Sequence, residues 1–148
     1  MNIAERLRAA AAERPDATAM VFIKEGTRLS FRELDADCDR VAAGLAALGV
    51  RPGMRAAVLV RPGPDFFAVA FGLFRLGAVP VLIDPGLGGK AYGRCLAEAD
   101  PEVFIAIPLA HAARVAFGWA KNARLKVVVG PVGYPGAPTL AAVRAPAG

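Results

Sequence analysis

The chain has 148 residues, which is about the length of one domain. It is 55% hydrophobic and 21% charged, so it can bury a core, and this composition excludes an intrinsically disordered chain. The net charge is +5, but the arginines are scattered and many have acidic neighbours, whereas nucleic-acid binding needs a basic stripe with interleaved aromatic residues. We therefore expect no nucleic acid among its partners.

A helix and a hairpin open the chain. Asn2 can cap a helix that runs to about Arg14, where a proline stops it. This segment has no uninterrupted apolar run before its first acidic residues, and transit peptides avoid such acidic residues. We therefore expect neither a secretory nor a transit peptide, and a cytoplasmic location. A strand over residues 17–23, a turn at Gly26 and a return over 28–30 predict a β-hairpin.

The next helix has the clearest boundaries. Ser30-Phe31-Arg32-Glu33 is a capping box, and Gly49 can end the helix. One face carries apolar residues at spacings of three and four, namely Phe31, Leu34, Cys38, Val41, Leu45 and Leu48. Acidic residues lie mostly away from that face, namely Glu33, Asp35, Asp37 and Asp39. Because alternate helical residues diverge, this group predicts a solvated helix face rather than a metal site.

Strands and helices then alternate. Apolar segments predict strands at residues 56–60, 79–83, 103–107 and 126–129. Helices begin between them at Pro64, Lys90 and Pro108. Short loops in this order predict parallel strands joined by right-handed crossovers. The expected fold class is α/β, with a mostly parallel sheet flanked by helices.

The expected organisation has three parts. Residues 1–54 form the helix, hairpin and capped helix, residues 55–130 form the βαβ units, and residues 131–148 form a Gly/Pro-rich tail without a convincing closing element. Within that tail, residues 139–144 can form one or two helical turns.

The apolar stretch from Phe66 to Gly88 raises the alternative of a membrane span. A span needs about 20 mostly apolar residues with few or no charges. Arg75 and Asp84 interrupt the stretch, and an arginine at bilayer depth is costly. A helix followed by a strand explains it better, so we expect no membrane span. The strand at 79–83 is apolar on both faces, which is typical of a central strand in a covered parallel sheet.

A glycine motif follows this strand. Residues 86–91 read G-L-G-G-K-A, a variant of the dinucleotide fingerprint, which makes Gly86, Gly88, Gly89 and Lys90 candidate cofactor-binding residues. Two features weaken this dinucleotide-binding interpretation: an Asp-Pro pair precedes the motif, and no acidic residue follows the next strand. It also fails the phosphate-loop pattern, since Ala91 stands where Ser or Thr must hold magnesium. A small nucleotide-binding module remains the alternative hypothesis.

No catalytic or metal-binding residue is predicted. His111 is the only histidine and has no identifiable nucleophile or carboxylate partner, so we expect a surface or boundary residue. Ser30 is the only serine and serves as a helix cap. Cys38 and Cys95 fit no metal spacing and are expected to be reduced, structural thiols on core faces.

Two segments resemble the first conserved regions of the AMP-forming acyl- and aryl-acid ligases. Leu29 to Leu34, reading LSFREL, is similar to the family's L-[ST]-[YF]-x-E-L helix start. Arg75 to Ala78, reading RLGA, is similar to the helix end that precedes an apolar strand and an Asp-Pro turn. With Arg61-Pro62 and Phe66-Phe67, the pattern is most similar to the fatty-acyl branch, particularly the β-lactone synthetases of olefin biosynthesis. The resemblance covers about residues 1 to 130.

The resemblance implies the first part of the large N-terminal domain of such a ligase. The whole enzyme would activate a carboxylic or fatty acid with ATP and Mg²⁺, and would pass the acyl group to coenzyme A or close a β-lactone. Within these 148 residues we find no Ser/Thr/Gly-rich phosphate loop, aromatic-Thr-Glu segment, ribose-binding aspartate or C-terminal domain. The chain by itself is therefore expected to be inactive. A non-catalytic interaction module is a further alternative, with homodimerisation or pairing at an open sheet edge.

Overall fold

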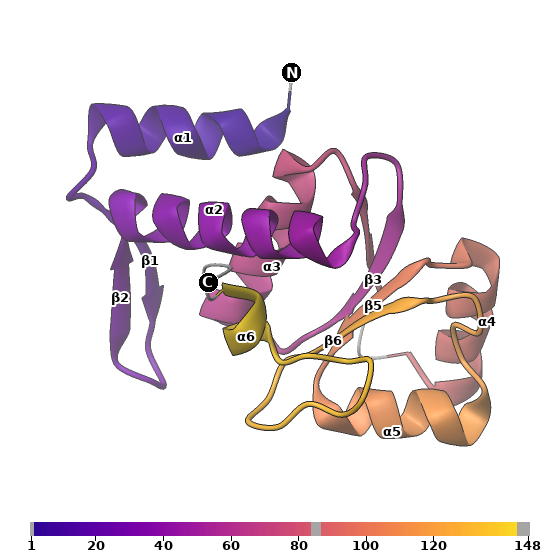
Figure 1. The fold of residues 1–148 in the computed structure, drawn as a ribbon. Coiled ribbons are helices and arrows are strands. Elements are labelled where there is room, and N and C mark those ends of the chain that lie inside the picture. The colour runs from indigo at the N-terminus through magenta and orange to yellow at the C-terminus, as the bar shows by residue number, and fades with distance from the viewer. Residues whose placement is uncertain (1, 84–86, 145–148) are drawn as a thin grey trace.

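The computed structural model describes residues 2–83 and 87–144, which form an α/β fold (Figure 1). Its elements in chain order are α1 (Ile3–Glu13), β1 (Thr18–Phe22), β2 (Thr27–Ser30), α2 (Phe31–Leu48), β3 (Arg55–Leu59), α3 (Pro64–Arg75), β4 (Val79–Leu82), α4 (Gly89–Ala99), β5 (Val103–Ala106), α5 (Pro108–Phe117), β6 (Leu125–Val128) and α6 (Leu140–Arg144). None of the helices in these two ranges is long and apolar enough to cross a membrane.

The main sheet has four parallel strands in the order β4-β3-β5-β6. Val58 of β3 is paired with Leu82 of β4 on one side and with Ile105 of β5 on the other. Helices α2, α3 and α6 cover one face, and α4 and α5 cover the other (Figure 1). The predicted fold class and helix–strand order are confirmed.

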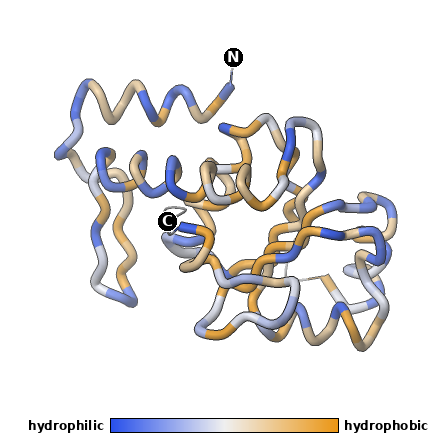
Figure 2. The backbone as a smooth tube through the Cα atoms, in the orientation of Figure 1, coloured by the Kyte–Doolittle hydropathy of each residue, from blue (hydrophilic) through white to orange (hydrophobic). Residues whose placement is uncertain are grey.

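The core has two layers because strand residues alternate between the two faces. Val58, Val103 and Ile105 pack toward α2 and α3, whereas Ala57 and Phe104 pack toward α4 and the loop after α5. Figure 2 shows the hydrophobic colouring concentrated along the strands of this sheet. The sheet is therefore covered on both faces, as an all-parallel sheet requires.

Strand β4 lies at the edge of the sheet, so the prediction that it is central is wrong. Val79 and Leu82 are about half exposed. Pro80 gives the physical reason, because a proline lacks the N–H that a strand with neighbours on both sides would use. The central strands are β3 and β5.

The N-terminal part forms a smaller unit beside the main sheet. Asn2 caps α1 by accepting a hydrogen bond from the Ala4 amide, and β1 and β2 pair as an antiparallel hairpin. The Ser30 hydroxyl accepts a hydrogen bond from the Glu33 amide at the start of α2, as the capping box predicts. The side chains of Leu34 and Cys38 on α2 form a small hydrophobic core with Leu7 of α1 and with residues of the hairpin.

The segment after β6 completes the core, so the expectation of a tail without a closing element is wrong for its described part. Val128 and Thr139 form a parallel bridge that continues the sheet, and α6 follows directly. Val143 of α6 packs so closely on α2 that a Cβ at Gly44 would overlap its carbonyl oxygen. Residues 145–148 lie outside the described ranges.

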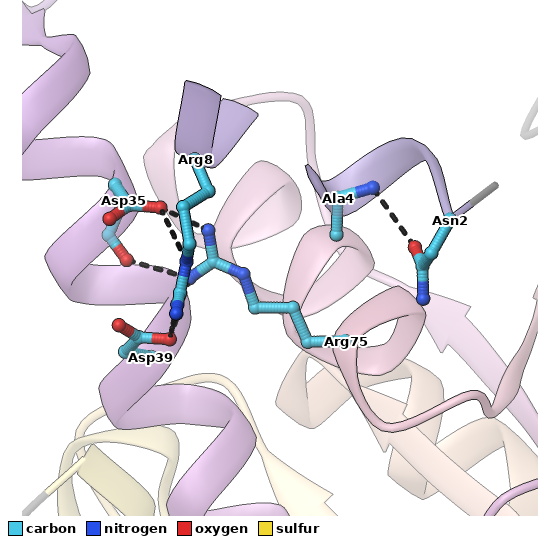
Figure 3. A network of polar contacts seen from close by, with 6 residues as sticks. All are labelled: Asn2, Ala4, Arg8, Asp35, Asp39 and Arg75. Atoms are coloured by element: carbon cyan, nitrogen blue, oxygen red, sulfur yellow. Dashed lines mark hydrogen bonds and ion pairs between the residues drawn. The ribbon is translucent and has the colours of Figure 1, made fainter. Parts of the chain in front are cut away.

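The acidic face of α2 is paired with arginines, so the prediction of a solvated face needs correction. Arg75 of α3 donates to the side chains of Asp35 and Asp39 and, at 2.8 Å, to the Asp35 carbonyl oxygen (Figure 3). Arg8 of α1 also pairs with Asp39 (Figure 3). The Arg75 side chain is only 11% exposed. Ion pairs thus link both α1 and α3 to the same turn of α2.

A second set of ion pairs joins α6 to α2 and α3. Arg144 donates two hydrogen bonds to Asp37, at 2.8 and 2.9 Å, and a third to Asp65 at 2.7 Å. The pKa of Arg144 is raised even though burial acts to lower it, because the hydrogen bonds to Asp65 and Asp37 favour its charged form. The acidic residues of α2 therefore serve as structural partners for three other helices.

Candidate functional site

The carboxyl ends of the parallel strands define the place where a site is expected. The chain passes from β3 to β4 on one side and then crosses to β5 on the other side of β3. Ligands of open α/β sheets bind outside the carboxyl ends of the strands, at the point where the strand order reverses. In this fold that point lies between β3 and β5.

An apolar cleft of about 540 Å³ lies there. The ends of β3 and β4 and the first turns of α3, α4 and α5 line it, and its walls include Leu59, Phe66, Leu82, Tyr92, Leu109 and Trp119. Arg61, in the loop after β3, is the charged residue in this lining. Its volume falls within the range of small-molecule sites, about 300–1,000 Å³.

A second, more polar cavity of about 960 Å³ runs along α4. Lys90, Lys121 and Phe117 line it, and it shares Gly89 and Trp119 with the apolar cleft. The two cavities therefore adjoin at the first turn of α4.

Three aromatic residues form the wall between the cavities. Tyr92 and Trp119 stack with centroids 5.6 Å apart, and Phe117 lies 5.3 Å from Trp119. A Cβ at Gly93 would come within 2.8 Å of the Trp119 indole nitrogen, so this close contact requires glycine. This wall was not predicted from the sequence. Its signal was the single tryptophan directly after Gly118, a residue with a positive φ that ends α5.

The predicted glycine motif reaches this region only in part. Gly86 lies outside the described residues, Gly88 is the N-cap of α4, and Gly89 and Lys90 begin the helix. Gly88 has a φ of −66°, and a Cβ at Gly88 or Gly89 would meet nothing within 4 Å. The packing of the chain therefore does not itself demand glycine at these two positions, and their role in cofactor binding remains a prediction.

His111 is buried, which corrects the prediction of a surface or boundary residue. Its Nε2 donates to the Val127 carbonyl oxygen at 2.8 Å, and its Nδ1 accepts from the Tyr134 hydroxyl at 2.9 Å. Burial lowers the pKa of His111, and although the Val127 bond acts to raise it, the charges of Arg114 and Lys126 lower it further. A neutral imidazole joins α5 to β6 and the following loop. Sequence reasoning missed its partner because Tyr134 is 23 residues away.

The two cysteines are free thiols. Cys38 is buried, and burial raises the pKa of its thiol to about 12, with the nearby Arg75 acting in the opposite direction. Cys95 is half-buried. Within residues 2–83 and 87–144, no three His, Cys, Asp or Glu side chains are grouped so that they could hold a metal ion.

Comparison with known proteins identifies the family. The sequence model of the AMP-binding enzymes matches residues 7–139. The chain belongs to the AMP-binding enzyme family. Its relatives include two olefin β-lactone synthetases. The one from Stenotrophomonas maltophilia is 48% identical over 139 residues, and the one from Xanthomonas campestris is 47% identical over 138 residues. Each alignment covers 87% of this chain and 25% of the relative.

Solved structures of the family share its fold. A fatty acyl CoA synthetase of Mycobacterium tuberculosis is 29% identical with a TM-score of 0.71, and the match covers 78% of this chain and 23% of that protein. An anthranilate CoA ligase in complex with anthranoyl-AMP has a TM-score of 0.85 at 22% identity, covering 97% of this chain and 28% of that one. The resemblance to AMP-forming ligases and to their β-lactone synthetase branch is thus confirmed. The chain spans about a quarter of the length of the two olefin β-lactone synthetases.

Proposed function

We propose that the chain forms the first part of the large N-terminal domain of an AMP-forming ligase for a carboxylic or fatty acid. Two matches carry this proposal: the family model over residues 7–139, and the alignment to a β-lactone synthetase of which the match covers 25%. In the whole enzyme the acid would react with ATP and Mg²⁺ to give an acyl-adenylate and pyrophosphate. The acyl group would then pass to coenzyme A or, as the name of the β-lactone synthetases suggests, close a β-lactone ring. A cytoplasmic location is part of the same proposal.

The contribution of these residues is structural. Arg75, which belongs to the family-like RLGA segment, binds α3 to α2, and the capping box sets the start of α2. By resemblance, the ATP-binding segments of the ligases have no counterpart in this sequence. The 148 residues by themselves therefore lack ligase activity.

Acid-dependent ATP–pyrophosphate exchange tests this proposal. We expect no exchange above background from the chain alone with fatty or aryl acids, and exchange by the purified chain would contradict the proposal. Titration with NAD, NADP and ATP tests the alternative nucleotide-binding module. Saturable binding that is lost in Gly88→Val would favour the alternative, and binding absent from both proteins supports the ligase proposal.

Pairing at the open edge of β4 is the proposed route to self-association. The Val79 amide donates to the Met54 carbonyl oxygen beside β3, so alternation directs the peptide groups of Pro80 and Leu82 outward. Pro80 has no N–H, which leaves the Leu82 amide as the outward donor of this strand. Any added strand is therefore short and weakly held. A monodisperse monomer at high concentration, by light scattering, would count against pairing.

A further inference from the structure

Helix α5 has an inverted distribution of polar and apolar side chains. Its two ionisable residues turn inward. The His111 ring bonds to the Val127 carbonyl oxygen and the Tyr134 hydroxyl, and the Arg114 guanidinium lies 5.8 Å from the centroid of the buried Phe104 ring. The exposed positions of the helix are all apolar, namely Pro108, Leu109, Ala112, Val115, Ala116 and Phe117. A surface helix normally presents its polar residues to solvent, so this arrangement is the reverse of the usual one.

These exposed residues, which we call the α5 face, continue into the loop after β6. Val115 is 70% exposed and Val132 is 73% exposed, and both border an apolar hollow of about 270 Å³ between the helix and the loop. Helix α5 lies on the outside of the fold, below the main sheet in Figure 1. Single exposed apolar residues are common, but a whole helix side of them marks a surface that another body covers.

Basic residues accompany the α5 face. From residue 103 to residue 148 the sequence has five arginines and lysines and no aspartate or glutamate. Lys121 and Arg124 follow the helix directly and are exposed. Asp100, which lines a cavity together with Lys121, accepts a hydrogen bond from Asn122. The charge beside the end of α5 is therefore mainly positive, and it complements an anionic surface.

From the inverted helix and its basic surroundings we infer that the α5 face binds an anionic lipid surface, with α5 parallel to the plane of the membrane. The apolar side chains enter the boundary between headgroups and acyl chains. Lys121 and Arg124 contact the lipid phosphates. The contact is peripheral and involves no membrane span. The inference is independent of the proposed ligase function.

Two other occupants fit the α5 face less well. In a symmetric contact between two copies the same patch meets itself, which would bring the Lys121 and Arg124 side chains of both copies together. A protein partner normally forms about one hydrogen bond per 100–200 Å² of interface, whereas the exposed side chains of α5 are hydrocarbon only. A lipid boundary needs no such bonds, because it accepts apolar side chains in its acyl region and cations at its headgroups.

Vesicle co-sedimentation with the full chain tests the inference. Vesicles of phosphatidylcholine and phosphatidylglycerol in equal amounts should bind the chain, and vesicles of phosphatidylcholine alone should bind it at least about tenfold more weakly. Trp119 is the only tryptophan, and its ring lies 5.3 Å from that of Phe117, so binding should shift its fluorescence to shorter wavelength. Equal binding to both kinds of vesicle, or none to the anionic ones, would overturn the inference.

Val115→Glu tests whether the α5 face makes the contact. The variant loses an inserted side chain and adds a negative charge at the membrane, so we expect binding more than about tenfold weaker. The fold is kept, because Val115 is exposed and glutamate is favoured over valine in a helix. Ile23→Glu is the matched control, since it changes the net charge equally at a residue in the hairpin turn that is 90% exposed, and it should leave binding unchanged. If both variants bind alike, the basic chain adsorbs without using α5 and the inference is wrong.

Lys121→Ala separates the charge from the apolar contribution. We expect binding about fivefold weaker at low salt, and a smaller difference at high salt, where the charges are screened. Two further outcomes would assign the α5 face to another occupant and overturn the inference. One is a dimer in light scattering that Val115→Glu abolishes, without vesicle binding. The other is vesicle binding by the chain that is lost when the chain replaces the matching region of a whole olefin β-lactone synthetase, because the rest of the enzyme would then cover the face.

Discussion

Loss of the Arg75 side chain is expected to destabilise the fold more than loss of any exposed arginine of the same network. In Arg75→Met the aliphatic stem is kept, while Asp35 and Asp39 lose their shared cation. Removing one partner of a fully buried pair costs about 3–5 kcal/mol, whereas exposed pairs contribute about 0–1 kcal/mol. The Arg75 and Asp35 side chains are 11% and 20% exposed, and Asp39 is 53% exposed. We therefore expect a loss of about 2–3 kcal/mol in the free energy of unfolding.

Urea denaturation followed by circular dichroism measures this loss. Arg8→Met is the matched control, because Arg8 contacts the same two aspartates but its side chain is 57% exposed, and it should cost under about 1 kcal/mol. Arg75→Lys keeps the charge but cannot reach two carboxylates and a carbonyl at once, so its loss should be intermediate. If Arg75→Met lowers the free energy of unfolding no more than Arg8→Met does, the ion pairs of Arg75 do not hold α3 against α2.

Three further changes test other parts of the fold. Gly93→Val should displace Trp119, shift its fluorescence and destabilise the chain by about 1–3 kcal/mol, and an unchanged spectrum would contradict the packing of the aromatic wall. Gly44→Leu should displace α6, which protease digestion of the C-terminal segment would reveal through cleavage near Val143. The folded state lowers the pKa of His111 below its unfolded value of about 6.5, so the unfolded chain binds the proton first and stability falls as pH drops below about 6.5. His111→Gln should remove this dependence, and a stability profile from pH 7.5 to about 5 that is unaltered in the variant would contradict it.

The local signals of the sequence predicted the fold well. The caps Asn2 and Ser30, together with the apolar spacing of α2, predicted the bounds of α1 and α2 to within a few residues. These features depend on residues a few positions apart, so a single sequence contains them. The alternation of strands and helices then constrained the sheet to be parallel.

Long-range partners could not be predicted in the same way. Strand β4 is apolar on both faces like a central strand, although Pro80 favours an edge, and the crossover from β4 past β3 to β5 places it there. Asp35 appeared solvated because Arg75 is 40 residues away, and His111 appeared isolated because Tyr134 follows it by 23. In each case the local pattern permits several environments, and a contact between distant segments decides among them.

The candidate site shows the same limit. The glycine motif was visible from sequence, and Gly89 and Lys90 do line the cavities. The apolar cleft was not visible, because its walls come from the ends of strands and helices spread over residues 58–119. A stretch that reads as a nucleotide fingerprint thus borders a site whose chemistry is mainly apolar.

The central claim, that this chain supplies part of an AMP-forming ligase, is tested most directly in a chimera. The matching region of the Stenotrophomonas maltophilia olefin β-lactone synthetase, 48% identical over 139 residues, is replaced by this chain. Acid-dependent ATP–pyrophosphate exchange is then measured for the parent enzyme, the chimera and the chain alone. The account predicts exchange by the parent and the chimera and none by the chain. A folded, monodisperse chimera without exchange, beside an active parent, would contradict it.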